Sequence, residues 1–176
     1  MYLVTMYFDE ESNKNLQRYI NMVAKSTGNT FMTYNNVPPH LTITAVEARS
    51  VDVLVPAFKG LEGRILGGKV TFTSIGQILP NVMYVTPVFN KCLMDTQNEV
   101  YKAFVDIPET TISKYYKPFS WLPHVTIAKQ LNKEQMAKAF EVMRDVFVPF
   151  EASIEKIGLS KVNPHVDVEE FRLYFP

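Results

Sequence analysis

Two pentapeptides, PHLTI at Pro39–Ile43 and PHVTI at Pro123–Ile127, repeat one pattern of proline, histidine, aliphatic residue, threonine and isoleucine. Successive side chains of a β-strand point to opposite faces, so a histidine and a threonine two residues apart share a face. The intervening aliphatic residues then face a hydrophobic layer. The preceding prolines favour extended backbone. The repeat predicts two equivalent strands, each presenting an imidazole beside a hydroxyl.

The same order of predicted elements surrounds each pentapeptide: strand, helix, histidine-bearing strand, helix, strand. In the first half these are a strand at Tyr2–Phe8, a helix capped by Asp9 and ended by Gly28, an extended segment at His40–Val46, a short helix capped by Ser50 and a strand at Lys69–Ile75. In the second half they are a strand at Val82–Val88, a helix capped by Asn90, an extended segment at His124–Ala128, a helix opened by Asn132 and Gln135, and strands at Phe150–Leu159 and Val168–Phe175. This order predicts a duplicated α+β fold.

The length and charge of the chain limit its organisation and its partners. The 176 residues fit one domain, 1–176, with approximate lobes 1–78 and 79–176 that can exchange strands. Lysine plus arginine equals aspartate plus glutamate at 18 each. Proteins that hold long nucleic acids by the backbone usually carry a basic surplus, because each neutralised phosphate adds affinity. A short RNA end or a small nucleotide therefore fits the charge balance better than a long duplex.

Other features favour a cytoplasmic protein. No apolar run approaches the ~20 residues that cross a bilayer, so we expect no membrane association. The first ten residues lack a basic segment and become acidic, unlike a secretory signal. The single cysteine, Cys92, excludes an internal disulfide and suits a reducing compartment. We expect a monomer.

The histidines and threonines of the repeats suit phosphodiester chemistry. Histidine has an ordinary pKa of ~6.5, so two imidazoles can hold opposite protonation states near neutrality. A neutral His40 or His124 would take a proton from the attacking oxygen, while the other, protonated, would give one to the leaving oxygen. Thr42 and Thr126 would donate hydrogen bonds to the phosphate oxygens. This chemistry needs neither metal nor cofactor.

With these two His-x-Thr motifs, the sequence resembles the 2H phosphoesterase superfamily, and most closely its branch of bacterial RNA 2′,3′-cyclic phosphodiesterases, also called 2′-5′ RNA ligases. The resemblance covers nearly the whole chain. It implies a bilobal fold with two antiparallel sheets facing a central cleft and helices outside. It also implies acid/base roles for His40 and His124 and phosphate binding by Thr42 and Thr126. Which histidine is the acid depends on the substrate and direction, and stays open.

The residues after the second motif depart from familiar members, many of which carry an arginine there. This chain has Ala128 and Lys129. In a regular strand Lys129, at an odd offset from His124, would not share the catalytic face. RNA ligation is therefore less favoured than hydrolysis.

The remaining aromatic, basic and histidine residues receive lesser roles. We expect Tyr34, Tyr115, Tyr116 and Lys117 to be the candidates for substrate binding, because aromatic rings can stack a base and a lysine can screen a phosphate. Phe119 and Trp121 can equally be the packed entry to a core strand. His165 lacks a following threonine and is interpreted as a solvated loop residue. The three histidines have no local metal-ligand spacing, so no metal site is expected.

The leading hypothesis is a metal-independent phosphodiesterase that hydrolyses a 2′,3′-cyclic phosphate at an RNA end or on a small nucleotide. A second hypothesis is 2′-5′ RNA ligation or cleavage of 2′-5′ oligonucleotides. A third, from another class, is a nucleotide- or RNA-binding module without turnover. The intact His/Thr pairs disfavour the third, because binding alone does not require both histidines.

Overall fold

A computed structural model describes residues 1–175 and contains eight strands and five α-helices. Their order and bounds are β1 (Tyr2–Phe8), α1 (Glu10–Thr27), α2 (Phe31–Tyr34), β2 (Leu41–Glu47), α3 (Val55–Lys59), β3 (Gly68–Ile78), β4 (Val82–Pro87), α4 (Lys91–Phe104), β5 (Thr111–Ile112), β6 (Val125–Ala128), α5 (Lys133–Val146), β7 (Phe150–Lys161) and β8 (Val166–Arg172). Short 3₁₀ turns lie at Val51–Val53 and Lys114–Tyr116. The α+β class predicted from the sequence is confirmed.

The strands form one continuous antiparallel network, with neighbours in the order β1-β2-β6-β4-β3-β7-β8 and with β5 beside β2. A further pairing of β1 with β7 closes six of these strands into a ring. The two expected sheets are thus joined, by β7 on one side and by the contact of β2 with β6 on the other. The closure matters for the site, because it brings the two histidine motifs side by side.

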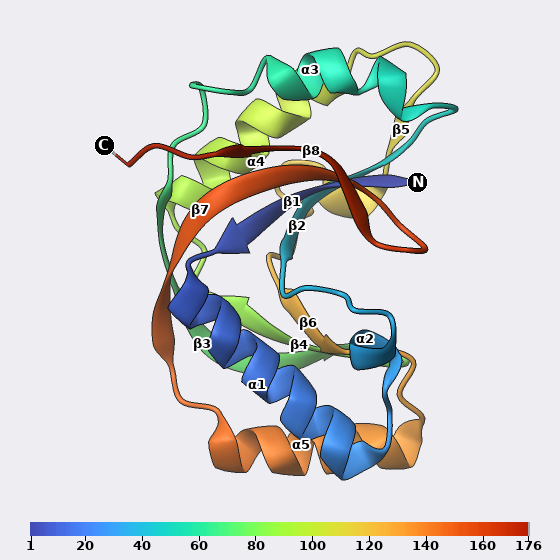
Figure 1. Ribbon diagram of the computed structural model, residues 1–176, viewed down its shortest axis with the longest axis vertical. Helices are drawn as coiled ribbons and strands as arrows, with labels where there is room; N and C mark the ends of the chain where they lie inside the picture. Colours follow the sequence, from blue (N-terminus) through green and yellow to red (C-terminus); the bar gives the residue numbers. More distant parts are fainter. Residues whose placement is uncertain (176) are drawn as a thin grey trace.

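The strands of the two sequence halves are interleaved. β3, from the first half, pairs with β4 and β7, whereas β7, from the second half, also pairs with β1. In Figure 1, helices α1 and α5 lie at one end of the molecule with β3, β4 and β6. Helices α3 and α4 lie at the other end, where α4 contacts β2. Helices thus cover both outer ends, and the histidine motifs lie between them.

Side-chain caps fix the beginnings of the three long helices. Asp9 accepts a hydrogen bond from Ser12 N at α1, and Asn90 accepts one from Leu93 N at α4. At α5, Asn132 and Gln135 form a reciprocal capping box. Such caps satisfy backbone N–H groups that lack a partner within the helix. The three caps were expected from the sequence and are confirmed.

Apolar faces of these helices pack against the sheet. The largest fully buried side chains include Tyr19, Phe58, Phe72, Phe104 and Met6. α4 ends at Phe104, and Ile107 lies beyond the helix. β8 begins two residues earlier than predicted and ends at Arg172. Among the described residues, no helix is both long and apolar enough to cross a membrane.

Candidate active site

The two pentapeptides meet where β2 pairs with β6. Leu41 and Val125, which occupy the same position in each motif, are antiparallel partners. In such a pair the residue before one partner lies opposite the residue after the other. His40 therefore lies beside Thr126, and His124 lies beside Thr42. The two copies of the sequence motif therefore lie side by side, with each histidine next to the threonine of the other motif.

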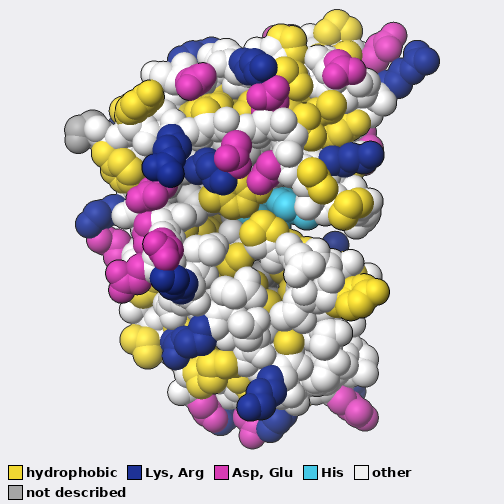
Figure 2. All heavy atoms as spheres, viewed as in Figure 1, with side chains coloured by type: hydrophobic (Ala, Val, Ile, Leu, Met, Phe, Trp, Pro, Cys, Tyr) yellow, Lys and Arg dark blue, Asp and Glu magenta, His cyan; other side chains and the backbone are white. Residues whose placement is uncertain are grey.

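Burial follows the alternation that the sequence predicted. Leu41, Ile43, Val125 and Ile127 are at most 1% exposed and belong to the core. The histidines are partly buried and stand immediately before β2 and β6 rather than within them. A histidine-coloured surface is visible near the middle of the molecule, between its two halves, in Figure 2. The motifs thus present their polar residues on the side opposite the core.

Each motif histidine is held by a backbone carbonyl two residues before it. His40 Nδ1 lies 2.8 Å from Pro38 O, and His124 Nδ1 lies 2.8 Å from Leu122 O. A carbonyl only accepts hydrogen bonds, so both Nδ1 atoms carry the proton. In the neutral ring this leaves the Nε2 lone pair free. Both imidazoles are therefore oriented to exchange a proton through Nε2.

Burial lowers the pKa of both motif histidines. Desolvation lowers the pKa of His40 to about 4, and the nearby His165 and His124 add to this shift. The hydrogen bond to Pro38 and the charge of Asp167 oppose it. Desolvation also lowers the pKa of His124, against the hydrogen bond to Leu122. Both rings are consequently neutral at pH 7 when no anion is bound.

A cavity of about 170 Å³ adjoins the first histidine. Its walls come from α2 and the loop after it, from β6 and from the β7–β8 turn, and include Phe31, Asn35, His40, Thr126, Lys129, Asn163 and His165. The inclusion of Lys129 corrects the expectation from strand parity. β6 ends at Ala128 and Gln130 adopts a positive φ of 61°, so the alternation of a regular strand no longer applies there.

His165 is part of this cluster, and its interpretation as a solvated loop residue is wrong. Its side chain is only 7% exposed. Its ring stacks on that of His40, with centroids 4.7 Å apart and planes inclined by 27°. Tyr7 Oη lies 2.9 Å from His165 Nε2 and donates to Asp167 Oδ1 at 2.6 Å. The turn before β8 is polar, as expected, but this residue points inward.

The single proton of the Tyr7 hydroxyl determines which of its neighbours donates and which accepts. The phenol has one proton, which it donates to Asp167. Its oxygen must therefore accept from His165 Nε2–H. Ser160 Oγ donates to the same carboxylate oxygen at 2.5 Å. A chain of hydrogen bonds thus runs from β8 through β1 to the ring that stacks on His40.

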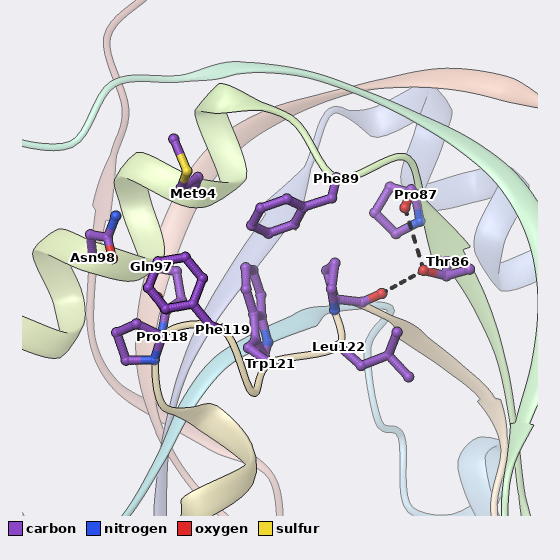
Figure 3. Close-up of a pocket in the computed structure, with 11 residues that line it drawn as sticks. Thr86, Pro87, Phe89, Met94, Gln97, Asn98, Pro118, Phe119, Trp121 and Leu122 are labelled. Carbon is purple, nitrogen blue, oxygen red and sulfur yellow. Dashed lines mark hydrogen bonds between the residues drawn. The ribbon is translucent and has the colours of Figure 1, made fainter.

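A larger cavity, of about 340 Å³, lies against the stretch that leads into the second motif (Figure 3), and His124 itself is not among its lining residues. Leu122 and Pro123, the residues immediately before His124, belong to its wall. The rings of Phe89, Phe119 and Trp121 surround the same space, and Trp121 Nε1 donates to Thr42 O at 2.9 Å. The stretch before the second motif therefore forms a cavity wall. Trp121 packs against the core at the entry to β6, whereas Phe119 is fully exposed, so the packed interpretation is wrong for Phe119.

The four candidate substrate-binding residues lie in different surroundings. Tyr34 is 82% exposed at the end of α2, and Tyr115 is 66% exposed beside Lys114. Lys117 is also exposed. Tyr116 differs: burial raises its pKa, and a hydrogen bond with the Thr42 side chain opposes the shift. Of the four, Tyr116 is the one that the structure brings to a motif residue.

Tyr7 and Asp167 escaped the sequence reasoning, as did Tyr84. Tyr84 packs on His124 with ring centroids 5.3 Å apart and is the strand partner of Thr126. Polar side chains inside the apolar strand β1 were the available signal for Tyr7. Within residues 1–175 there is no group of three or more His, Cys, Asp or Glu side chains arranged to hold a metal ion.

Comparison with solved structures shows the same fold at low sequence identity. Escherichia coli LigT complexed with 3′-AMP superposes with a TM-score of 0.67 at 14% identity, covering 98% of this chain and 97% of LigT. A structure described as a phosphoesterase gives 0.65 at 14% identity, with 98% of both chains covered. LigT complexed with ATP gives 0.57 at 16% identity, covering 98% and 97%. No curated protein sequence matches the chain.

A family comparison extends over most of the sequence. The model of the 2′-5′ RNA ligase superfamily matches residues 13–165, which include both His-x-Thr motifs and His165. The resemblance to two-histidine phosphoesterases noted in the sequence is confirmed. The chain belongs to the 2′-5′ RNA ligase superfamily.

Proposed function

We propose that this protein is a phosphodiesterase that hydrolyses a 2′,3′-cyclic phosphate, on an RNA end or a small nucleotide, by general acid/base catalysis with His40 and His124. One observation carries the proposal. The pairing of Leu41 with Val125 sets two imidazoles, each with Nδ1 fixed on a carbonyl and Nε2 free, beside the threonines of the opposite motif. Two proton-transfer groups flanking two hydroxyl donors match the needs of phosphodiester cleavage.

The reaction then proceeds with balanced proton transfer. The neutral imidazole accepts a proton at Nε2 from a water molecule while the water oxygen bonds to phosphorus. The bond from phosphorus to one ribose oxygen breaks, and the protonated imidazole gives its Nε2 proton to that oxygen. Thr42 and Thr126 donate hydrogen bonds to the non-bridging oxygens, where charge accumulates. No step requires a metal ion.

Substrate binding explains how one ring becomes protonated. Both motif histidines have lowered pKa values in the empty site, chiefly through desolvation. A bound phosphate places negative charge beside both rings and so favours the imidazolium form. A proton on one of the two imidazoles disfavours a proton on the other. The bound anion therefore prepares one acid and one base, and the roles exchange when the reaction runs in reverse.

A nucleotide substrate fits the surroundings of the site. The cavity lined by Leu122 and Pro123, the two residues before His124 in the sequence, falls within the range of roughly 300–1,000 Å³ typical of small-molecule sites and offers the ring faces of Phe119 and Trp121. Aromatic faces bind bases of any sequence by stacking. The equal numbers of acidic and basic residues favour a short RNA end over a long polyanion. LigT structures that contain 3′-AMP and ATP support the same ligand class.

Formation or cleavage of 2′-5′ linkages is a second candidate, favoured by Lys129. Ligation was less favoured because Lys129, at an odd offset from His124, would face away from the site in a regular strand. Its position in the wall of the His40 cavity removes that objection. A cation there can screen the phosphates of two RNA ends.

We also propose that the protein is cytoplasmic, since the single Cys92 suits a reducing compartment. We further propose that it acts as a monomer.

A substrate panel in EDTA tests the proposal. The protein is incubated with a 2′,3′-cyclic-phosphate oligonucleotide, 2′,3′-cyclic mononucleotides, a 2′-5′ oligoadenylate and a pair of RNA ends. We expect opening of the cyclic phosphate to a 2′-phosphate, with EDTA having no effect. Activity that EDTA abolishes would refute the metal-free mechanism. Nucleotide binding without turnover of any substrate would instead establish a binding module.

A further inference from the structure

The His40 ring is packed against a third histidine that lies outside both motifs. His165 comes from the turn between β7 and β8, and its centroid lies 4.7 Å from that of His40. Tyr7, from β1, approaches both rings edge-on, at 6.5 Å from each. One strand and one turn thus converge on the His40 imidazole. The packing leaves that ring little freedom to rotate.

The position of His165 is itself determined by buried hydrogen bonds. Tyr7 is 7% exposed, and its hydroxyl links His165 Nε2 to the Asp167 carboxylate. Ser160, fully buried, donates to the same carboxylate oxygen. A polar network with every member satisfied holds one arrangement in a low-dielectric interior. The surface turn that carries His165 is thereby fixed to the sheet.

Close backbone passage at Gly158 makes room for this network. A Cβ at that position would lie 2.9 Å from Asp167 Oδ1 and 2.9 Å from Tyr7 Cε2. Gly158 pairs with Thr5 of β1. The absence of a side chain at the centre of β7 therefore lets the phenol and the carboxylate meet. The need for glycine at this position comes from Asp167 and Tyr7 and does not depend on how the His165 ring packs.

We propose that His165, held by Tyr7 and Asp167, is a positioning residue that fixes the His40 imidazole and controls its protonation in the reaction. The proposal rests on the function proposed above. The His165 ring acts by contact and by charge: it buttresses His40, and a proton on either ring disfavours a proton on the other. It does not itself need to touch the reacting atoms.

The charged and titratable groups around His40 come from every neighbouring element. They are His165 and Asp167 from the β7–β8 hairpin, Tyr7 from β1, His124 from the start of β6, Lys129 after β6, and Lys156 from β7, whose ammonium lies 4.9 Å from the Tyr7 ring centroid. Proximity to His165 and His124 lowers the pKa of His40, and Asp167 raises it. Removing His165 removes one lowering influence and part of the burial.

His165→Ala and Tyr7→Phe test the inference, with Val166→Ala as the matched control. Val166 is the next residue in the same hairpin and is 51% exposed. The His40 pKa is measured by the NMR titration of its imidazole nitrogens, which needs no turnover. Steady-state kinetics on the cyclic phosphate give kcat and KM across pH. Thermal unfolding establishes that each variant is folded under the conditions used.

In His165→Ala we expect the His40 pKa to rise by about one unit, and kcat to fall about tenfold with KM changed less than twofold. The limb of the pH–rate profile that belongs to His40 moves to higher pH: the acidic limb if His40 is the base, the alkaline limb if it is the acid. Tyr7→Phe gives the same changes to a smaller degree, and Val166→Ala gives none.

An unchanged His40 titration and unchanged kcat in folded His165→Ala would overturn the inference. So would a fall in kcat of equal size in Val166→Ala. Failure of the proposed function is a separate outcome, seen as absence of turnover in the wild-type protein. The His40 titration would then still decide whether His165 controls that ring.

Discussion

His40 and His165 lie face to face, with ring centroids 4.7 Å apart, although one precedes β2 and the other follows β7. β1 pairs with both β2 and β7, and its Tyr7 ring contacts both imidazoles. One ring belongs to the repeated motif and the other does not. The two halves of the site therefore differ: His40 has an imidazole neighbour, and His124 has the Tyr84 ring.

Stability is expected to fall between pH 6.5 and 4. Desolvation lowers the pKa of His40 from 6.5 to about 4 and also lowers the pKa of His124 and His165. Below pH 6.5 the unfolded chain binds more protons than the native chain, so acid favours unfolding. His40 alone lowers the free energy of unfolding by on the order of 3 kcal/mol as the pH falls through this window.

Urea unfolding at pH 7, 5.5 and 4 measures this effect, with His40→Asn as the comparison. The variant should show a shallower fall in unfolding free energy with acid than the wild-type protein. Equal slopes for the two proteins would show that His40 is not desolvated in the native state.

Gly158→Ala should destabilise the protein through the Tyr7–Asp167 contact. The added methyl group would come within 2.9 Å of both side chains, and overpacking of this kind costs about 1–3 kcal/mol. Gly60→Ala is the matched control, because a Cβ there meets backbone oxygens at an ordinary 3.5 Å. Thermal and chemical unfolding compare the two. A Gly158 variant as stable as the Gly60 variant would mean that the network tolerates displacement.

Tyr116→Phe should impair turnover, whereas Tyr115→Phe should not. The Tyr116 hydroxyl bonds with the side chain of Thr42, whereas Tyr115 is 66% exposed. Losing one hydrogen bond that orients a phosphate-binding group costs about 0.5–1.5 kcal/mol, which corresponds to a decrease of roughly two- to tenfold in kcat/KM. Steady-state kinetics on the cyclic phosphate provide the measurement. Equal effects of the two substitutions would exclude an indirect role through Thr42.

Much of the fold was predictable because its signals are local. The caps at Asp9, Asn90 and Asn132 and the apolar faces of the long helices follow from neighbouring residues alone. The four-residue helix α2 and the two-residue strand β5 are too short to give a periodic pattern. Closure of the sheet by β1 and β7 depends on contacts between the two ends of the chain, which no local pattern records.

The same division applies to the site. Alternation within each pentapeptide correctly separated His40 and Thr42 from Leu41. His165 was misread because its partner Tyr7 lies at the other end of the chain. Lys129 was misjudged because strand parity was extended past the end of β6, where Gln130 turns the backbone. Local rules therefore identified the motif, and tertiary contacts added its neighbours.

The central claim is that His40 and His124 act as one catalytic unit. Hydrolysis of a 2′,3′-cyclic-phosphate oligonucleotide is measured in EDTA with the wild-type protein, His40→Ala, His124→Ala and the double variant. Residues that act together are not additive, so each single variant should lose nearly as much activity as the double variant, at least 10³-fold. Wild-type activity retained in either single variant, or a double loss equal to the product of the two single losses, would contradict the account.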